Sequence, residues 1–138
     1  MTIDLPEDYR PSEDEPYMNP RQLEYFRRKL LKWREEILRG SDLTLQQLQQ
    51  EGERPADFTD LASSESQRFV ELRTRDRERK LLAKIDAALK RIEEGTYGYC
   101  EETHEPIGLK RLEARPIATL SIEAQERHER REKVYRDD

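Results

Sequence analysis

Cys100 is the one cysteine of this chain, and it stands in a spacing typical of a four-cysteine metal site. Cysteine at Cys100, Thr103, Ser121 and Ala124 would give C-x2-C-x17-C-x2-C, a strong zinc-ribbon signature, since a structural zinc takes four tetrahedral ligands. Three of these positions carry Thr, Ser and Ala, and a neutral hydroxyl is a poor zinc ligand. We therefore expect no zinc, and packing in place of the metal.

Few other side chains could join Cys100 in a site. The only further soft ligands are His104 and His128, and nothing in the sequence places them together. A lone cysteine is either a small buried hydrophobe or a redox-sensitive thiol, and we favour the first. The hydroxyls of Thr103 and Ser121 can bond backbone amides or each other. We expect a small core around them from Tyr97, Tyr99, Ile107, Leu109, Leu112, Ile117, Leu120 and Ile122.

The composition limits what these residues can belong to. Of 138 residues, 33% are hydrophobic and 41% charged, with a net charge of −5, which favours long exposed helices over a compact core. An acidic pI near 5.3 argues against a general nucleic-acid coat. No apolar run approaches the roughly 20 residues that span a bilayer. The acidic start is unlike a secretory signal, and one cysteine cannot form an intramolecular disulfide, so we expect a cytoplasmic protein.

Two long helical patterns precede the Cys100 region. The first runs from about 20 to about 51, starting at Asn19-Pro20, and Gly40-Ser41 should weaken it. The second runs from about 59 to 94 and ends at Gly95. Apolar residues three and four apart predict a coiled-coil seam in each. These are Leu23, Phe26, Leu30, Trp33 and Ile37 in the first helix, and Phe69, Leu72, Leu82, Ile85, Leu89 and Ile92 in the second.

These patterns predict a mainly α fold: a long antiparallel helical hairpin, or coiled coil, with a small zinc-ribbon-like globular module and a C-terminal helix from about 121 to 135. Residues 1–19, with several prolines, form an extended segment that packs on or near the globular part. Residues 20–94 form the hairpin, with its tip at about 52–62. Residues 95–138 form the module and the last helix.

Three strings carry a resemblance to a known family. They are R-D-R-E-R-K-L-L at 75–82, Y-G-Y-C at 97–100 and I-G-L-K-R-L-E-A-R-P at 107–116. In these the chain closely resembles the DksA/TraR family, bacterial regulators that bind RNA polymerase without touching DNA. The resemblance covers roughly 20–135, and L-E-A-R-P is its most specific part. The chain departs from the family in lacking three of the four cysteines.

The resemblance implies that the hairpin enters the secondary channel of RNA polymerase and brings acidic residues towards the catalytic centre. Asp57, Asp60 and Ala62 match the family's D-x-x-D-x-A tip. Carboxylates at the end of a rigid arm would place negative charge in a cation-rich pocket. The ordinary alternative for both aspartates is capping of a helix N-terminus, and the two roles can coexist.

The resemblance also implies contacts with polymerase and the alarmone ppGpp. Guanidinium and ammonium groups suit phosphate oxygens, although each basic residue alone could equally serve a solvated surface. The family's lysine after the last zinc ligand is Gln125 here, which removes one cation. The matching interface positions are Arg77, Leu81, Lys84, Arg111 and Arg115.

The expected function is therefore a monomeric regulator of transcription initiation in the stringent response. It would lower stable-RNA promoters, use ppGpp as co-regulator, hold no tightly bound cofactor, and touch neither DNA nor membrane. It is not expected to be an enzyme, since the sequence has no Gly-rich phosphate loop and no His/Asp/Ser constellation. Two alternatives remain: a Gre-like transcript cleavage factor, and a coiled-coil adaptor that docks another protein.

Overall fold

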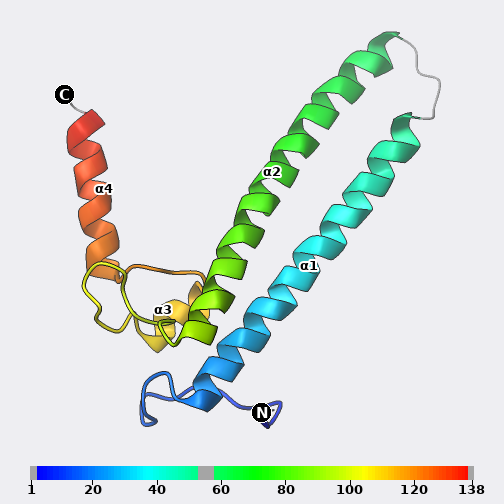
Figure 1. Cartoon of the computed structure of the whole chain (residues 1–138). Helices are drawn as coiled ribbons and strands as arrows, with labels where there is room; N and C mark the ends of the chain where they lie inside the picture. The colour runs from blue at the N-terminus through cyan, green and yellow to red at the C-terminus, as the bar shows by residue number, and fades with distance from the viewer. Residues whose placement is uncertain (1–2, 53–57, 137–138) are drawn as a thin grey trace. The chain divides into compact units, whose positions relative to one another are not determined.

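The computed structural model describes residues 3–52 and 58–136, and the side chains of residues 3–40 and 65–134. Its helices are α1 (Pro20–Gly52), α2 (Phe58–Glu94), α3 (Leu109–Ala114) and α4 (Ile122–Arg136) (Figure 1). Within these ranges the only β pairing is an isolated antiparallel bridge between Tyr99 and Pro106. The predicted mainly α fold is confirmed, and α3 is a helix that the sequence pattern did not predict. No described helix is long and apolar enough to cross a membrane.

Local chemistry explains where the long helices begin and end. The Asn19 side-chain oxygen accepts from the Gln22 amide at 2.9 Å, an N-cap placed just before Pro20. At the C-terminus of α2, Gly95 has a φ of 80° and ends the helix. The amide of Thr96 bonds the Arg91 carbonyl at 2.9 Å, a Schellman arrangement. α1 is continuous through Gly40-Ser41, so the predicted local weakening does not break the helix.

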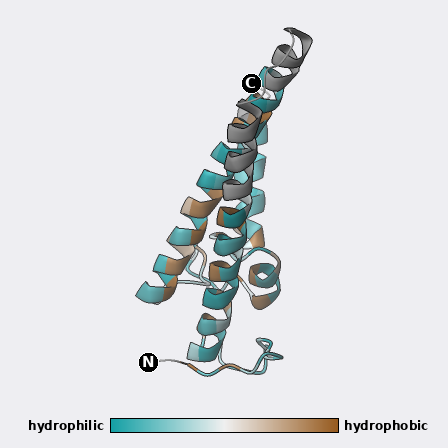
Figure 2. Cartoon of the chain, turned by 90° about the vertical axis from the view of Figure 1, so that its right-hand side faces the viewer, coloured by the Kyte–Doolittle hydropathy of each residue, from teal (hydrophilic) through white to brown (hydrophobic). Residues whose placement is uncertain are grey.

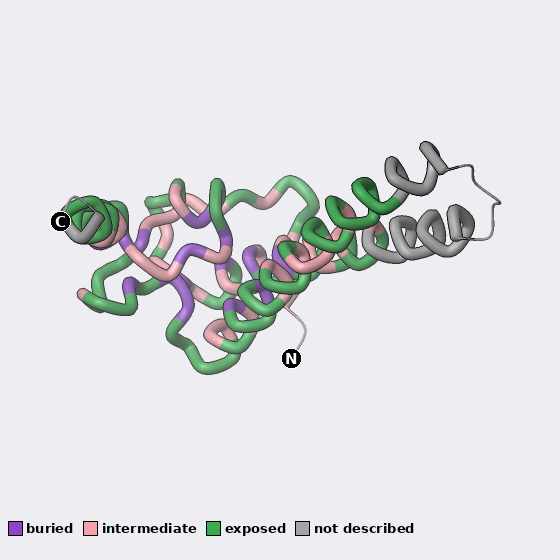
Figure 3. Tube along the Cα trace, turned by 90° about the horizontal axis from the view of Figure 1, so that it is seen from above, coloured by how far each residue is buried: buried purple, intermediate pink, exposed green. Residues whose placement is uncertain are grey.

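The chain divides into two compact units, and the second comprises Leu31–Asp86. Its described helical segments run antiparallel side by side (Figure 1), and Arg34 of α1 pairs with Asp86 of α2 at 2.9 Å. Ile85 is fully buried, as the seam predicted. Phe69 and Leu72 are 63% and 57% exposed, so their assignment to the seam is wrong. Figure 3 shows the described turns of this unit mostly exposed or half-buried.

The first unit comprises Met1–Leu30 and Ala87–Asp138 and holds the larger core. The Phe26 and Tyr97 rings lie 5.7 Å apart between centroids, and the Tyr97 hydroxyl donates to the Pro116 carbonyl at 2.8 Å. Burial raises the pKa of Tyr97, so this hydroxyl stays protonated and donates. The buried hydrophobic residues of the unit are Met18, Phe26, Leu30, Ala88, Tyr97, Cys100, Ile107, Leu112, Ala118 and Ala124.

The predicted module core is only partly confirmed. Tyr97, Ile107 and Leu112 are buried, whereas Tyr99 is 37% and Ile122 54% exposed. At the start of α4 the inward positions are taken by small residues next to Ile122, which leaves its side chain outside. Figure 2 shows hydrophilic residues over most of the described helices and apolar residues in short separate segments.

Gly98 marks a close approach between the N-terminal segment and the turn before Cys100. Its φ is 90°, and a Cβ there would lie 2.8 Å from Met18 Cγ and 3.3 Å from the Tyr17 hydroxyl. Gly95 has a similar φ of 80°, yet a Cβ there would meet nothing within 4 Å. The two glycines therefore share a backbone requirement and differ in crowding.

Gly98→Ala should lower the free energy of unfolding by about 2–3 kcal/mol, because it adds a clash to the strain of a left-handed backbone. Gly95→Ala should cost only about 1 kcal/mol, because strain acts there alone. Urea unfolding of both variants measures the difference. Equal losses would contradict the close contact with Met18.

Candidate functional site: the Cys100 turn and the charged helix faces

Residues 98–107 fold back tightly around Cys100. The Ile107 amide donates to the Gly98 carbonyl at 2.8 Å, and the Cys100 amide donates to the Glu105 carbonyl at 2.8 Å. The His104 amide returns to the Cys100 carbonyl at 2.9 Å, with a His104 φ of 63°. These bonds bend the chain into a compact turn that holds the thiol inside, where Cys100 is 1% exposed.

The buried Cys100 thiol has a lowered pKa. Burial raises the pKa of the thiol, but the Thr103 hydroxyl and the amides of Ser121, Thr103 and Glu102 outweigh it and lower the pKa to about 6. The Ser121 amide comes from the start of α4, so the two halves of the predicted four-residue frame do meet in space.

Ser121 and Ala124 complete that frame on the α4 side. Both are buried, Ser121 6% and Ala124 0% exposed. The Ser121 hydroxyl accepts from the Ala124 amide at 3.2 Å, and the Thr103 hydroxyl accepts from the Glu105 amide at 3.3 Å. The predicted hydrogen bonds between these hydroxyls and backbone amides are confirmed. The Thr103 bond lies in the turn after Cys100, and the Ser121 bond lies at the start of α4.

Tyr17 is a residue that the sequence analysis missed. Its hydroxyl donates to the Gly98 carbonyl at 2.7 Å and accepts from the Gly108 amide at 2.9 Å. Gly108 directly precedes α3, so this hydroxyl joins the N-terminal segment to the Cys100 turn and to the start of that helix. No sequence signal points to it, because its partners lie more than 80 positions away.

Glu113, within L-E-A-R-P, links α3 to the first turns of α1. Its carboxylate accepts from the Tyr25 hydroxyl at 2.5 Å and from Lys29 Nζ at 2.9 Å, while Lys29 also bonds the Glu113 carbonyl. Burial and the neighbouring carboxylate raise the pKa of Tyr25 to about 12.

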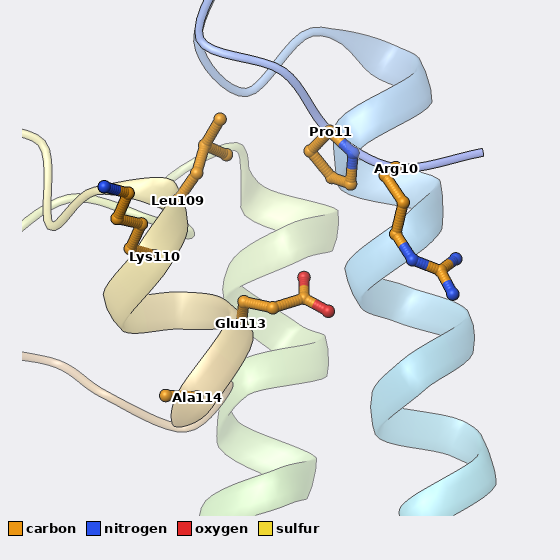
Figure 4. Close-up of a pocket in the computed structure, with 6 residues that line it drawn as sticks. All are labelled: Arg10, Pro11, Leu109, Lys110, Glu113 and Ala114. Atoms are coloured by element: carbon orange, nitrogen blue, oxygen red, sulfur yellow. The ribbon is translucent and has the colours of Figure 1, made fainter. Parts of the chain in front are cut away.

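An open pocket of about 520 Å³ lies beside Glu113. In Figure 4 Glu113 and Lys110 point to different sides of α3. The pocket is lined by Arg10, Pro11, Leu109, Lys110, Glu113 and Ala114.

The predicted interface residues fall in both units. In the second unit Arg77 and Lys84 are exposed and Leu81 is half-buried, and their spacing of four and three places them on one face of α2. In the first unit Arg115 is exposed just after α3. The Arg111 guanidinium instead donates to the Leu120 carbonyl at 2.9 Å, a bond that holds α3 to the segment before α4.

The predicted tip lies largely outside the described residues. Asp57 is not described. Asp60 and Ala62 belong to α2, but their side chains are outside the described set. Their part in the site stays a prediction.

Comparisons with known proteins cover nearly the whole chain. Residues 22–92 match a family model described as DnaK suppressor protein DksA, N-terminal domain, and residues 95–130 match the prokaryotic dksA/traR C4-type zinc finger. A Caulobacter vibrioides protein named RNA polymerase-binding transcription factor DksA is 71% identical over 131 residues, which are 95% of this chain and 92% of its own length.

A second named relative and a solved structure are also similar to most of the chain. The Escherichia coli K12 protein of the same name is 44% identical over 127 residues, covering 92% of this chain and 84% of its own. The solved structure of transcription factor DksA2 from Pseudomonas aeruginosa has a TM-score of 0.79 and 51% identity, covering 85% of this chain and 90% of that one.

The zinc-finger match corrects one prediction. We expected no zinc, but residues 95–130 fit the model of a C4-type zinc finger, so zinc is expected for this module. The residues themselves offer one thiolate, Cys100, beside Thr103, Ser121 and Ala124. Among the described residues no group of three or more His, Cys, Asp or Glu could hold a metal ion, so this donor set does not fit a four-ligand site.

Tyr17→Phe should lower the free energy of unfolding by about 1–3 kcal/mol, because the Gly98 carbonyl and the Gly108 amide both lose a partner. Tyr99→Phe is the matched control, since this ring contacts Tyr17 edge-on at 5.6 Å and is partly exposed. Thermal and urea unfolding measure both. A loss no larger than that of the control would contradict the bridging role of the Tyr17 hydroxyl.

Glu113→Gln should lower the free energy of unfolding by about 1 kcal/mol at pH 7. It should also make that free energy fall less steeply as the pH is lowered. Burial raises the pKa of Glu113, but Tyr25 and Lys29 lower it more, to below the ordinary value of 4.5. The carboxylate thus contributes stability above pH 4.5 that is lost as the pH falls through the lowered pKa.

Unfolding free energies from pH 7 to pH 3 measure this effect. The control is Glu126→Gln on an exposed part of α4, which should leave the wild-type slope unchanged. A Glu113→Gln curve parallel to the wild type over the whole range would contradict the assignment.

Proposed function

This chain belongs to the DksA family, and from that premise we propose that it binds RNA polymerase and modulates transcription initiation. The observation that carries the proposal is 71% identity, across 95% of the chain, to a protein named as an RNA polymerase-binding transcription factor. Its relatives named in this way are transcription factors, and we accordingly assign no catalytic reaction to the chain. It would act as a monomer in the cytoplasm, without binding DNA.

The hairpin is the element we propose enters the secondary channel of the polymerase. Asp57 and Asp60, followed by Ala62, would lie at its tip, close to the catalytic centre. A carboxylate brought near bound magnesium and cationic side chains alters the local potential more strongly than it would in water. We propose that this field lowers initiation at stable-RNA promoters, as in the stringent response.

ppGpp is the co-regulator that we propose for the complex. Arg77, Leu81 and Lys84 share one face of α2 in the second unit, and Arg115 is exposed in the first. A guanidinium suits phosphate oxygens, so Arg77 and Arg115 are each candidates for such a contact. Arg111 would act indirectly, by holding α3 through its bond to Leu120. Gln125 contributes no charge where the family has a lysine, so the response to ppGpp should be weaker than with that cation present.

Asp57→Asn with Asp60→Asn should abolish regulation at a ribosomal RNA promoter and change polymerase affinity by less than about threefold, because the tip charge acts only after binding. Competition binding and transcription with purified polymerase measure the two effects. Glu65→Gln, an exposed acid on α2 beyond the tip, is the control and should keep both.

Two outcomes would point elsewhere. Full regulation by the Asp57→Asn, Asp60→Asn protein would contradict the tip mechanism and favour a simple adaptor. Asp57-dependent cleavage of RNA in backtracked complexes would identify a Gre-like cleavage factor instead.

A further inference from the structure

Arg115 combines an exposed side chain with a firmly held backbone. Its amide donates to the Arg111 carbonyl at 2.8 Å, and its carbonyl accepts from the Ala118 amide at 3.0 Å. The next carbonyl, that of Pro116, accepts from the buried Tyr97 hydroxyl at 2.8 Å. Within the described part of the chain the Arg115 guanidinium itself has no hydrogen bond or ion pair. The backbone is therefore fixed while the charge remains available to a ligand.

Lys29 of α1 holds the chain just before Arg115. Its ammonium group donates to the Glu113 carbonyl at 2.8 Å and to the Glu113 carboxylate at 2.9 Å. In Figure 4 the Glu113 side chain points from α3 toward α1. The carbonyl lies in the last turn of a six-residue helix, where backbone carbonyls lack a partner within the helix. One lysine thus binds both the backbone and the side chain of Glu113, two positions before Arg115.

The contact between Lys29 and Glu113 is more than an ordinary surface ion pair. The two side chains are 33% and 43% exposed, and such a pair alone contributes little to stability. The bond to the carbonyl constrains the backbone, which a bond between two side chains does not. Tyr25 donates to the same carboxylate at 2.5 Å, so two residues of α1 hold Glu113. Together these bonds fix the place where α3 ends.

A fixed backbone matters for a guanidinium that meets a phosphate. Arginine donates in a planar fork, which matches phosphate oxygens only over a narrow range of orientations. Ordering a long side chain on binding costs conformational entropy, and ordering its backbone as well adds to that cost. A segment that is already held therefore binds the phosphate more tightly.

We propose that Lys29 is a positioning residue for ppGpp: its two bonds to Glu113 hold the end of α3 so that Arg115 meets a phosphate group of the co-regulator. The role assigned to Lys29 rests on the proposed function. Lys29 touches neither ppGpp nor polymerase and acts through Glu113 and Arg115. Its loss therefore weakens the response to ppGpp and leaves the effect of the protein alone unchanged.

The chain offers matched variants for this role. Lys29→Met keeps the aliphatic stem and removes both bonds, whereas Lys29→Arg keeps a cationic donor for the same two acceptors. Lys32→Met, at an exposed lysine one turn further along α1, is the charge-matched control. Each full-length protein is used at saturating concentration in transcription from a ribosomal RNA promoter with purified polymerase. The measured quantity is the ppGpp concentration that gives half of its added effect.

Lys29→Met should raise that concentration about three- to tenfold and change the effect without ppGpp by less than about twofold. Lys29→Arg and Lys32→Met should both stay within about twofold of the wild type. In an Arg115→Ala background Lys29→Met should add no further rise, because both substitutions act on one contact.

The outcomes separate this role from the proposed function. An unchanged ppGpp concentration for Lys29→Met, or an equally large rise in the Arg115→Ala background, overturns the role of Lys29 and leaves the proposed function standing. A wild type that regulates alone without responding to ppGpp overturns the role of Lys29 and the co-regulator, but not polymerase binding. A wild type with no effect on transcription overturns both.

Hydrogen exchange gives a readout that needs no polymerase. Lys29→Met should speed exchange at the amides of Arg115 and Ala118 by about threefold or more, because both lie in the segment that Lys29 holds. The Ile107 amide, bonded within the Cys100 turn, is the internal reference for a general loss of stability. Lys32→Met should leave all three amides unchanged. Exchange at Arg115 and Ala118 that does not rise relative to Ile107 overturns the positioning role.

Discussion

A chain with one hydrophobic residue in three can fill only a small interior, and this scarcity shapes the molecule. In the first unit the fully buried side chains include Phe26, Leu30, Tyr97 and Leu112. Around them, directed hydrogen bonds hold the segments that contribute little apolar area. The Tyr17 hydroxyl and the Glu113 carboxylate each join segments that lie more than 80 positions apart in the chain.

In the second unit the scarcity of hydrophobic residues leaves apolar side chains exposed. Its described turns bury little beyond Ile85, and Phe69, Val70 and Leu72 are left at the surface. An arm of this kind is kept helical mainly by its backbone hydrogen bonds and by pairs one turn apart, such as Arg39 with Glu35. Exposed apolar groups on such an arm cost solubility, and contact with a partner removes that cost.

The sequence predicted the long helices well because their caps and apolar periods are local signals. Asn19-Pro20 and Gly95 marked ends that the structure keeps to within a residue. The seam failed at Phe69 and Leu72 because periodicity shows which residues share a face, not which molecule covers that face. It gave no hint of Tyr17, whose partners are brought near only by the complete fold.

The zinc prediction failed for a different reason. The prediction considered only the side chains at the four ligand positions, whereas the match to the zinc-finger family extends over residues 95–130. Within that stretch, the backbone amides of Ser121, Thr103 and Glu102 help to lower the pKa of the Cys100 thiol. Compact turns of this kind hold α3 and α4 together, and exposed Arg115 lies just beyond α3.

The central claim is that this chain regulates transcription by binding RNA polymerase through its hairpin. Its most direct test is transcription in vitro from a ribosomal RNA promoter with saturating protein, with and without ppGpp. We expect a marked fall in transcript output with the protein alone and a further fall when ppGpp is added. Output that does not change under either condition would contradict it.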